Sequence, residues 1–374
     1  MRPGHPPSRN PWNLEHYCGG SSAGAGVSVE VGSSLLALGT DAGGSVRKPA
    51  AVTGTVGLKP THGAVSGHGT VRAASSPSLD HVGTFTRTAQ DARLVLRALW
   101  GADARDPRTG PPAAGPPGEA AVPEGLRLGV APATLGGDLV RADVRAVYER
   151  ALGELEAQGA TLVEVELPSF ATLPLPACFA ILLHEVASVH RAWLATRPEE
   201  YVRETRLVLE QGALLPAAHV HGANRARARL KAEARTAFEQ GRLHAFVTPT
   251  LPITSMPLAE MDTGRDLPAL IPFTCPWNLT GQPALSVPCG LTDAGLPVGL
   301  QLVGRPLEDD LILAIAERYQ HETDWHGQRA PPSAACVSWS RGGGQLAVLR
   351  PMRVLGRAPD VRIEWSPSAR GLAR

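Results

Sequence analysis

Residues 126–167 carry the pattern that most restricts how this chain can fold. LRLGV (126–130) and TLVEVEL (161–167) are short runs rich in branched apolar residues, which is typical of strands. Between them, from about Ala142 to Gln158, apolar residues recur at helical spacing, and Gly159 suits the end of a helix. A strand, an amphipathic helix and a second strand make a βαβ unit, in which the two strands pair in parallel. The pattern therefore predicts an α/β fold.

Other segments extend this unit with further helices and strands. Thr88 to Trp100 is expected to be a helix, because Thr88 and Asp91 have the spacing of a capping box. The turn sequence TDAG between two apolar runs predicts a hairpin. The remaining expected elements are, in chain order, a mainly helical region at about 177–238, strands at 245–250, 284–288 and 298–304, and a helix at about 307–319.

Composition divides the chain into one long folded part and two irregular segments. Residues 107–123 are rich in Pro, Gly and Ala, which predicts a surface linker. Residues 333–374 contain RGGG, several arginines and few acids, without a convincing periodicity, so we expect a tail of little order. We therefore predict a single domain over residues 1–332.

Charge and cysteine usage exclude several classes of protein. The net charge of +1 provides no broad field for nucleic acid or an anionic membrane, so we expect neither as a partner. No run is apolar and long enough to span a bilayer, and the first residues lack the apolar core of a signal peptide. Five scattered cysteines without CxxC spacing predict reduced thiols rather than a disulfide frame or a zinc site. These features favour a cytoplasmic protein.

Two Gly-Ser clusters near the start of the sequence suggest a nucleophile. One is GTDAGGS, which ends at Ser45, and the other is CGGSSAGAG at 18–26. An activated serine needs an exposed hydroxyl, a proton acceptor and donors for the oxyanion. The two glycines before Ser45 leave room for backbone N–H groups to converge, and Asp41 and Arg47 could hold the turn through a charge-assisted pair. Each cluster alone is equally compatible with a structural loop.

Together with other motifs, the two clusters resemble those of the amidase signature family. The motifs occur in order from about Asn10 to Pro332: NPWN, GGSSAG, ALGTDAGGSVRKPA, VGLKPTHGAVS, LDHVGTFTRTAQDA, VTPTLPIT and NLTGQPALSVPCG…GLPVGLQLVGRP. The Gly-Ser-rich signature is highly specific. The resemblance implies the amidase-signature α/β fold, a single mixed β-sheet covered on both faces by α-helices.

The resemblance also implies which residues form the site. Ser45 would be the acyl-accepting serine, and Ser21 would be the bridging serine, with a cis Gly20–Ser21 bond and a hydroxyl within hydrogen-bond reach of Ser45. Trp277 and Asn278 match a segment near the acyl pocket, where a core role is equally compatible. The implied oxyanion donors are the backbone N–H groups of Ala42, Gly43, Gly44 and Ser45, and the implied supporting residues are Thr40, Asp41 and Arg47. Neither a metal nor a cofactor is implied.

The general base of the family is a lysine upstream of the serine signature, and no lysine precedes Ser21 here. Lys59 matches a structural position, and Lys231 lies in an Arg- and Ala-rich segment that favours a solvated charge. Lys48 has S-x-x-K spacing, but we expect Pro49 to hold it out of helical geometry, so we reject it as a base. We therefore expect that an N-terminal part is missing and that this chain alone has negligible amidase activity.

The implied function is hydrolysis of a carbon–nitrogen amide bond of a small molecule through a serine acyl-enzyme. Within the family, a glutaminyl amidotransferase subunit of the transamidosome is an alternative, although the segment at 200–234 looks more like that of stand-alone amidases. A catalytically inactive remnant that serves as a binding or regulatory module is a third interpretation. A small-molecule amide is the expected partner, and a homodimer is compatible with the sequence.

Overall fold

The computed structural model describes residues 7–70, 76–109, 118, 120–135 and 139–331, except for the side chains at 134–135 and 263–265. These residues belong to one compact unit that ends at Pro331. Most of the expected linker at 107–123 and the whole expected tail at 333–374 lie outside them. Within the described ranges, none of the helices combines the length and apolar character that a membrane crossing requires.

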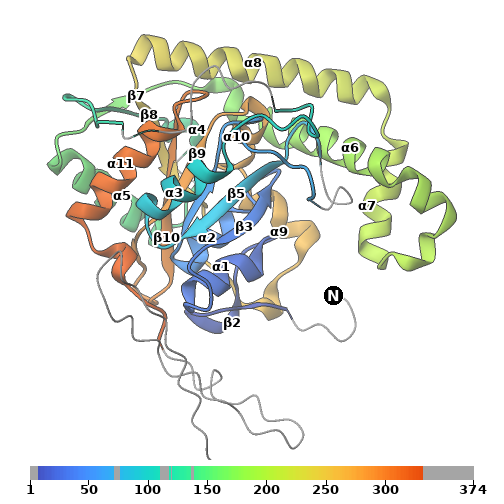
Figure 1. The fold of residues 1–374 in the computed structure, drawn as a ribbon, viewed down its shortest axis with the longest axis horizontal. Helices are drawn as coiled ribbons and strands as arrows, with labels where there is room; N and C mark the ends of the chain where they lie inside the picture. Colours follow the sequence, from blue (N-terminus) through green and yellow to red (C-terminus); the bar gives the residue numbers. More distant parts are fainter. Residues whose placement is uncertain (1–6, 71–75, 110–117, 119, 136–138, 332–374) are drawn as a thin grey trace, which may run out of the picture. The chain divides into compact units, whose positions relative to one another are not determined.

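A mixed eight-stranded sheet forms the centre of this unit (Figure 1). Its spatial order is β3-β5-β4-β9-β10-β8-β6-β7, with antiparallel pairing from β3 through β8 and parallel pairing of β6 with β8 and β7. The strands span Ala37–Asp41 (β3), Val56–Lys59 (β4), His81–Thr86 (β5), Arg127–Val130 (β6), Thr161–Glu164 (β7), Ala245–Pro249 (β8), Ala284–Leu291 (β9) and Pro297–Val303 (β10). A separate hairpin joins β1 (Arg9–Asn10) to β2 (Asn13–Tyr17).

Helices cover both faces of the sheet. Gly290 on β9 faces Val147 of α5 (Ala142–Ala157), whereas Gly299 on β10 faces Ala51 of α2 (Arg47–Thr53). The other helices span Ala23–Glu30 (α1), Ala89–Leu99 (α3), Pro132–Leu135 (α4), Pro174–Thr196 (α6), Arg203–Leu214 (α7), Ala217–Gly241 (α8), Thr263–Leu270 (α9), Cys275–Thr280 (α10) and Asp309–Glu322 (α11). α6 packs on both α7 and α8, and α3 packs on α11 (Figure 1). The expected α/β fold with a single mixed sheet is confirmed.

The elements expected from local sequence patterns are present. β6 and β7 pair in parallel with α5 between them in the sequence, although β7 ends at Glu164 rather than at Leu167. Thr88 begins α3 as its N-cap, and its hydroxyl accepts a hydrogen bond from the Asp91 N–H at 3.0 Å. β9 and β10 form the expected antiparallel hairpin. Each of these predictions depended on residues that are close together in the chain.

The Gly-Gly-Ser motif lies between an edge strand and a buried helix. β3 is at one edge of the sheet, where it pairs with β5. All seven residues of α2 are buried, and the helix contacts β4, β9 and β10. The loop at 42–46 is therefore attached at one end to a sheet edge and at the other to the core.

Candidate functional site

The loop between β3 and α2 contains the first Gly-Ser cluster. Asp41 ends the strand and Arg47 begins the helix, so residues 42–46 turn the chain from one to the other. Gly44 has a φ of +118°, which L side chains rarely adopt, and a Cβ there would lie 2.4 Å from Thr274 Oγ1. Glycine is therefore required at this point of the turn.

A fully buried ion pair holds both ends of the loop. Arg47 Nη2 lies 2.9 Å from Asp41 Oδ1, and Arg47 Nε lies 3.1 Å from Asp41 Oδ2. The same carboxylate accepts backbone N–H bonds from Gly44 (2.7 Å) and Val46 (3.1 Å). Burial alone would raise the pKa of Asp41, but the Arg47 guanidinium and the hydrogen bonds from Arg47 and Asn278 hold it well below its usual range. The pair suggested by the sequence is formed with bidentate geometry.

Three residues from distant parts of the chain complete this network. Arg47 Nη1 donates to the Thr274 carbonyl (2.9 Å) and to Gln301 Oε1 (2.8 Å). Asn278 Nδ2 donates to the backbone carbonyl of Asp41 (2.7 Å) and to its Oδ1 (2.9 Å). Sequence reasoning missed Thr274 and Gln301, and it singled out Asn278 only through the resemblance. A buried glutamine in the apolar run VGLQLVG was the signal that could have found Gln301.

Backbone N–H groups beside Ser45 are available for an oxyanion. Across the described ranges, no hydrogen bond is formed by the N–H of Ala42, Gly43 or Ser45. The fourth expected donor differs, because the Gly44 N–H already donates to Asp41 Oδ1 at 2.7 Å. Ser45 is half-buried. The geometry thus leaves three of the four expected N–H groups unpaired next to the serine.

The second Gly-Ser cluster contacts this loop through Ser22. The Ser22 N–H donates to the Ser45 carbonyl (3.2 Å), and Ser22 Oγ accepts a hydrogen bond from the Thr40 N–H (3.2 Å). The Gly20–Ser21 peptide bond is cis, and Ser21 is exposed. Ser21 and Ser45 both lie in the described part of the chain, and no hydrogen bond joins their hydroxyls. The direct contact expected between them is therefore absent in this state, and Ser22, which the sequence did not single out, makes the connection.

Lys48 lies inside α2, so the expectation that Pro49 would displace it is wrong. Its backbone N–H donates to the Gly44 carbonyl at 2.7 Å, and α2 continues through Pro49 to Thr53. A proline in the first turn of a helix is tolerated, because the N–H that it lacks has no partner within the helix. The Lys48 side chain is 4% exposed, and no described residue forms a hydrogen bond with its ammonium group. Burial lowers the pKa of Lys48 to about 8.

Lys59 is buried too, but its ammonium group is held by backbone carbonyls. Lys59 Nζ donates to the carbonyl of Gln282 at 2.5 Å and to that of Pro60 at 3.2 Å. Burial lowers the pKa of Lys59 well below its usual value. These contacts tie β4 to the start of β9, which fits the structural position that the resemblance assigns to Lys59.

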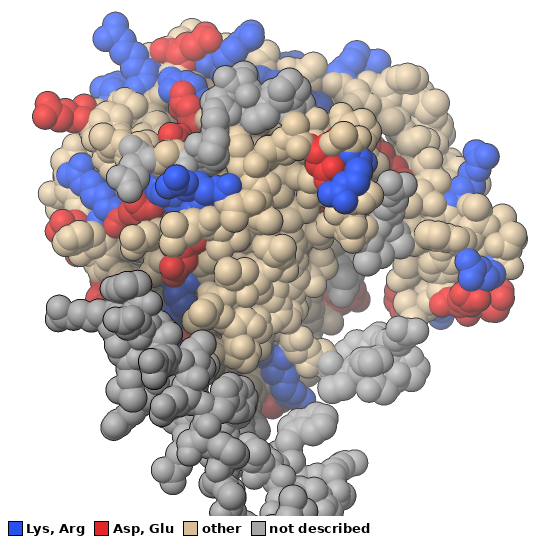
Figure 2. Space-filling view, in the orientation of Figure 1, with Lys and Arg blue, Asp and Glu red and all other residues tan. Residues whose placement is uncertain are grey.

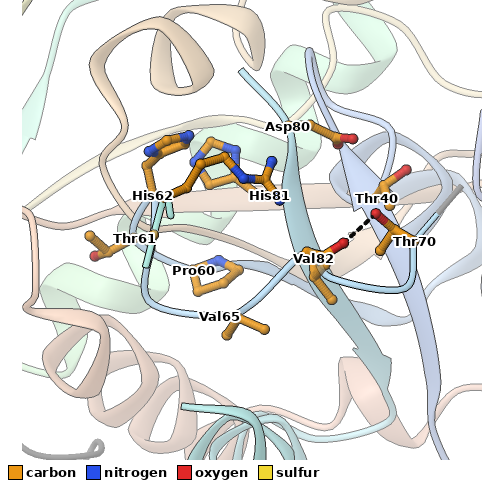
Figure 3. Close-up of a pocket in the computed structure, with 12 residues that line it drawn as sticks. Thr40, Pro60, Thr61, His62, Val65, Thr70, Asp80, His81 and Val82 are labelled. Carbon is orange, nitrogen blue, oxygen red and sulfur yellow. Dashed lines mark hydrogen bonds between the residues drawn. The ribbon is translucent and has the colours of Figure 1, made fainter. Parts of the chain in front are cut away.

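A small polar cavity is lined by Thr40, His62 and His81 among other residues (Figure 3). His81 Nδ1 is 2.7 Å from the Leu79 carbonyl and 3.3 Å from that of Asp41. The rings of His62 and His81 meet edge to face, with centroids 5.0 Å apart, and Thr40 lies at the other end (Figure 3). Burial lowers the pKa of His62 to about 4. The cavity volume of about 10 Å³ accommodates one water-sized molecule and is too small for an amide substrate.

The side of the loop at Gly43 faces small apolar groups. A Cβ at Gly43 would meet Cys178 Sγ at 3.8 Å, Ile271 Cδ1 at 3.9 Å and Cys275 Cβ at 4.0 Å. Thr274 Oγ1 donates to the Gly43 carbonyl at 2.7 Å and fixes the orientation of this peptide. Groups from α6, α10 and the segment before α10 therefore form an apolar wall beside the unpaired N–H groups.

Comparisons with known proteins agree with the motifs. A glutamyl-tRNA(Gln) amidotransferase subunit from Symbiobacterium thermophilum is 40% identical over 350 residues, which cover 86% of this chain and 70% of that protein. The solved structure of a glutamyl-tRNA(Gln) amidotransferase subunit from Thermotoga maritima has a TM-score of 0.70 and 32% identity, and the match covers 83% of this chain and 67% of that one. The structure of 6-aminohexanoate cyclic dimer hydrolase complexed with substrate has a TM-score of 0.76 and 28% identity. This match covers 86% of this chain and 71% of that one.

The family model described as Amidase matches residues 2–313, which include both Gly-Ser clusters, the βαβ unit and the β9–β10 hairpin. The match extends over most of the chain, and the proteins to which the chain is similar include a hydrolase and an amidotransferase subunit. The chain therefore belongs to the amidase signature family of enzymes, as its motifs indicated.

Proposed function

We propose that this chain breaks a carbon–nitrogen amide bond with Ser45 as the nucleophile. The observation that carries the proposal is the position of Ser45 beside the unpaired N–H groups of Ala42 and Gly43 and its own N–H. Unpaired N–H groups next to a serine suit acyl transfer, because they can stabilise the negative charge that develops on the carbonyl oxygen.

In the proposed reaction, Ser45 Oγ attacks the amide carbonyl carbon while a base accepts its proton. The carbonyl oxygen becomes an oxyanion that the unpaired N–H groups bind. The C–N bond then breaks, the base passes the proton to the leaving nitrogen, and ammonia or an amine leaves. Water attacks the resulting ester, releases the acid and restores the Ser45 hydroxyl. We propose Ser21 as the bridging hydroxyl, in a contact with Ser45 that tightens in the substrate complex, as catalytic hydrogen bonds often do.

Thr40, Asp41 and Arg47 are proposed as positioning residues. Asp41 bonds to backbone N–H groups on both sides of Ser45, and Arg47 links the same carboxylate to α10 and β10. Thr40 holds the second Gly-Ser cluster against the loop through Ser22. This arrangement restricts the loop before substrate arrives, so little reorganisation is needed during the reaction.

A second candidate function is that of an amidotransferase subunit, which the similarity to subunits of glutamyl-tRNA(Gln) amidotransferase favours. An amidotransferase needs nitrogen released from a donor amide, and the acyl transfer proposed for Ser45 would release it. The proposed substrate class in both cases is a small-molecule amide. The two candidates differ in the fate of the nitrogen, which passes to an acceptor in one and to solvent in the other.

A fluorophosphonate probe tests the proposed nucleophile. We expect the probe to label the protein, Ser45→Ala to abolish labelling, and Ser33→Ala, which changes an exposed serine outside the site, to leave it intact. Labelling that survives Ser45→Ala would contradict the role of Ser45. Ammonia release from glutamine compared with acetamide separates the two candidates, since no preference for glutamine would count against the amidotransferase function.

A further inference from the structure

The central sheet has two edges, and they differ in charge. In the described structure, β3 and β7 are the outermost strands of this sheet. β7 ends at the exposed Glu164, and the exposed Glu166 follows it, so charged groups protect this edge. Residues 31–40, which lead into β3 and form most of it, contain no Asp, Glu, Lys, Arg or His. The β3 edge therefore lacks the charges with which proteins prevent edge-to-edge pairing.

Large apolar side chains are exposed at the β3 edge. Leu35 is 91% exposed, and Leu36 and Leu38 are 46% and 50% exposed. Leu36 and Leu38 are two positions apart, so an extended chain turns them to the same face. The opposite face is covered, since a Cβ at Gly39 would lie 2.9 Å from the ring of the buried Phe85. The middle of the surface drawn in Figure 2, where Figure 1 places β3 and β5, is formed by uncharged residues. Exposed apolar side chains grouped in this way indicate an interaction surface.

Backbone groups at the β3 edge are also free to pair. The backbone of Thr40 points away from β5, because its N–H donates to Ser22 Oγ (3.2 Å) and its carbonyl accepts from the same hydroxyl (3.3 Å). These orientations alternate along an antiparallel strand, so the N–H and C=O of Leu38, and of Leu36 just before the strand, also point away from β5. None of the described residues forms a hydrogen bond with them. Leu36 and Leu38 can therefore each exchange two hydrogen bonds with another strand.

The arrangement of these groups is self-complementary. When two copies of β3 pair antiparallel about a two-fold axis at Ala37, Leu36 of one copy lies opposite Leu38 of the other. Both residues then exchange two hydrogen bonds across the axis, and the leucines form cross-strand pairs on one face. Because this segment carries no charge, the two-fold axis brings no like charges together. Pairing ends before Thr40, whose outward groups the Ser22 hydroxyl already occupies.

We propose that the β3 edge binds a second copy of this chain, and that the two copies pair through residues 36–38 into a two-fold dimer. A second copy is favoured over an extended segment of a different protein, because a single register pairs both outward-facing residues and places the leucines opposite each other. The contact is small, so we expect a weak dimer with a Kd of about 1–100 µM. Each copy uses its β3 edge once and the two-fold axis closes the contact, so association stops at two copies.

Sedimentation of the full chain over a range of concentrations tests this interface. We expect a monomer–dimer equilibrium. Leu38→Lys should raise the Kd about tenfold or more, because it places a charge in each leucine pair and two like charges beside the same axis. Leu36→Lys should act in the same way, and it changes a residue outside the strand, so an effect of Leu38→Lys on folding would not decide the test. Leu94→Lys is the matched control, since Leu94 is a 59% exposed leucine of α3, and the Kd should not change.

Hydrogen exchange locates the contact. At concentrations where the dimer dominates, the amides of Leu36 and Leu38 should exchange more slowly than in dilute protein, and Leu38→Lys should remove this protection. A protein that stays monomeric at about 300 µM, above the expected Kd, would overturn the proposal. A dimer whose Kd the two lysine variants leave unchanged, or association that continues beyond two copies, would overturn it too. Each of these results would leave the proposed role of Ser45 intact, because the probe labelling of Ser45 does not require a dimer.

Discussion

Replacing Lys48 by methionine is expected to stabilise the protein at neutral pH. Lys48 is in α2, is 4% exposed and has no hydrogen-bond partner for its ammonium group in the described structure. Methionine keeps an unbranched chain of similar length and removes the charge. A buried charge without close partners is costly, so its replacement by an apolar side chain should raise the free energy of unfolding.

The change in the Lys48 pKa sets the size of this effect. Burial lowers this pKa from its ordinary value near 10.5 to about 8, although Asp41 opposes the change. A difference of this size corresponds to about 3 kcal/mol. Because the folded pKa is the lower one, the penalty is fully present below about pH 8 and is relieved as the pH rises toward about 10.5. At about pH 9.5 we expect a remaining penalty of about 1 kcal/mol.

Urea unfolding of the full chain at about pH 7 and at about pH 9.5 measures this dependence. The gain from Lys48→Met should fall from about 3 to about 1 kcal/mol between the two conditions. Lys231→Met is the control, because it makes the same chemical change at an exposed position of α8 and should give a much smaller gain at either pH. A loss of stability in Lys48→Met, or a gain that does not change with pH, would refute the argument that the ammonium is desolvated.

Two further changes test how the loop is held. Arg47→Met should destabilise the fold by about 3–5 kcal/mol in urea unfolding, because it leaves the Asp41 carboxylate buried without its cation. A loss of stability below about 1 kcal/mol would contradict the role of Arg47 in holding the loop. Gly44→Ala should lower the free energy of unfolding by about 1–3 kcal/mol more than Gly295→Ala does. Both glycines have a positive φ, but only at Gly44 would a Cβ meet another atom within 4 Å. Equal losses in the two alanine variants would show that the contact with Thr274 is unimportant.

Parts of the site that depend on neighbouring residues could be predicted from the sequence. The motif GTDAGGS places Asp41 and Ser45 on one turn, and the structure holds that turn with the Asp41–Arg47 pair that the spacing suggested. The βαβ unit followed in the same way from apolar periodicity within residues 126–167. The helical position of Lys48 was not predicted, because the rule that a residue before proline avoids helical geometry is weakest in the first turn of a helix.

The remainder of the network could not be predicted, because it depends on contacts across the whole chain. A buried guanidinium has five N–H donors, and each needs an acceptor. Arg47 meets this requirement through Asp41, Asn278, Gln301 and the Thr274 carbonyl. The sequence implies that a buried arginine in GGSVR must find such acceptors. Only the pairing of β4 with β9, and of β9 with β10, brings residues more than 200 positions away beside α2. For the same reason the hydrogen-bond partner of the Gly44 N–H could not be predicted. This N–H donates to Asp41 rather than remaining free for an oxyanion, because the network orients the Asp41 carboxylate toward it.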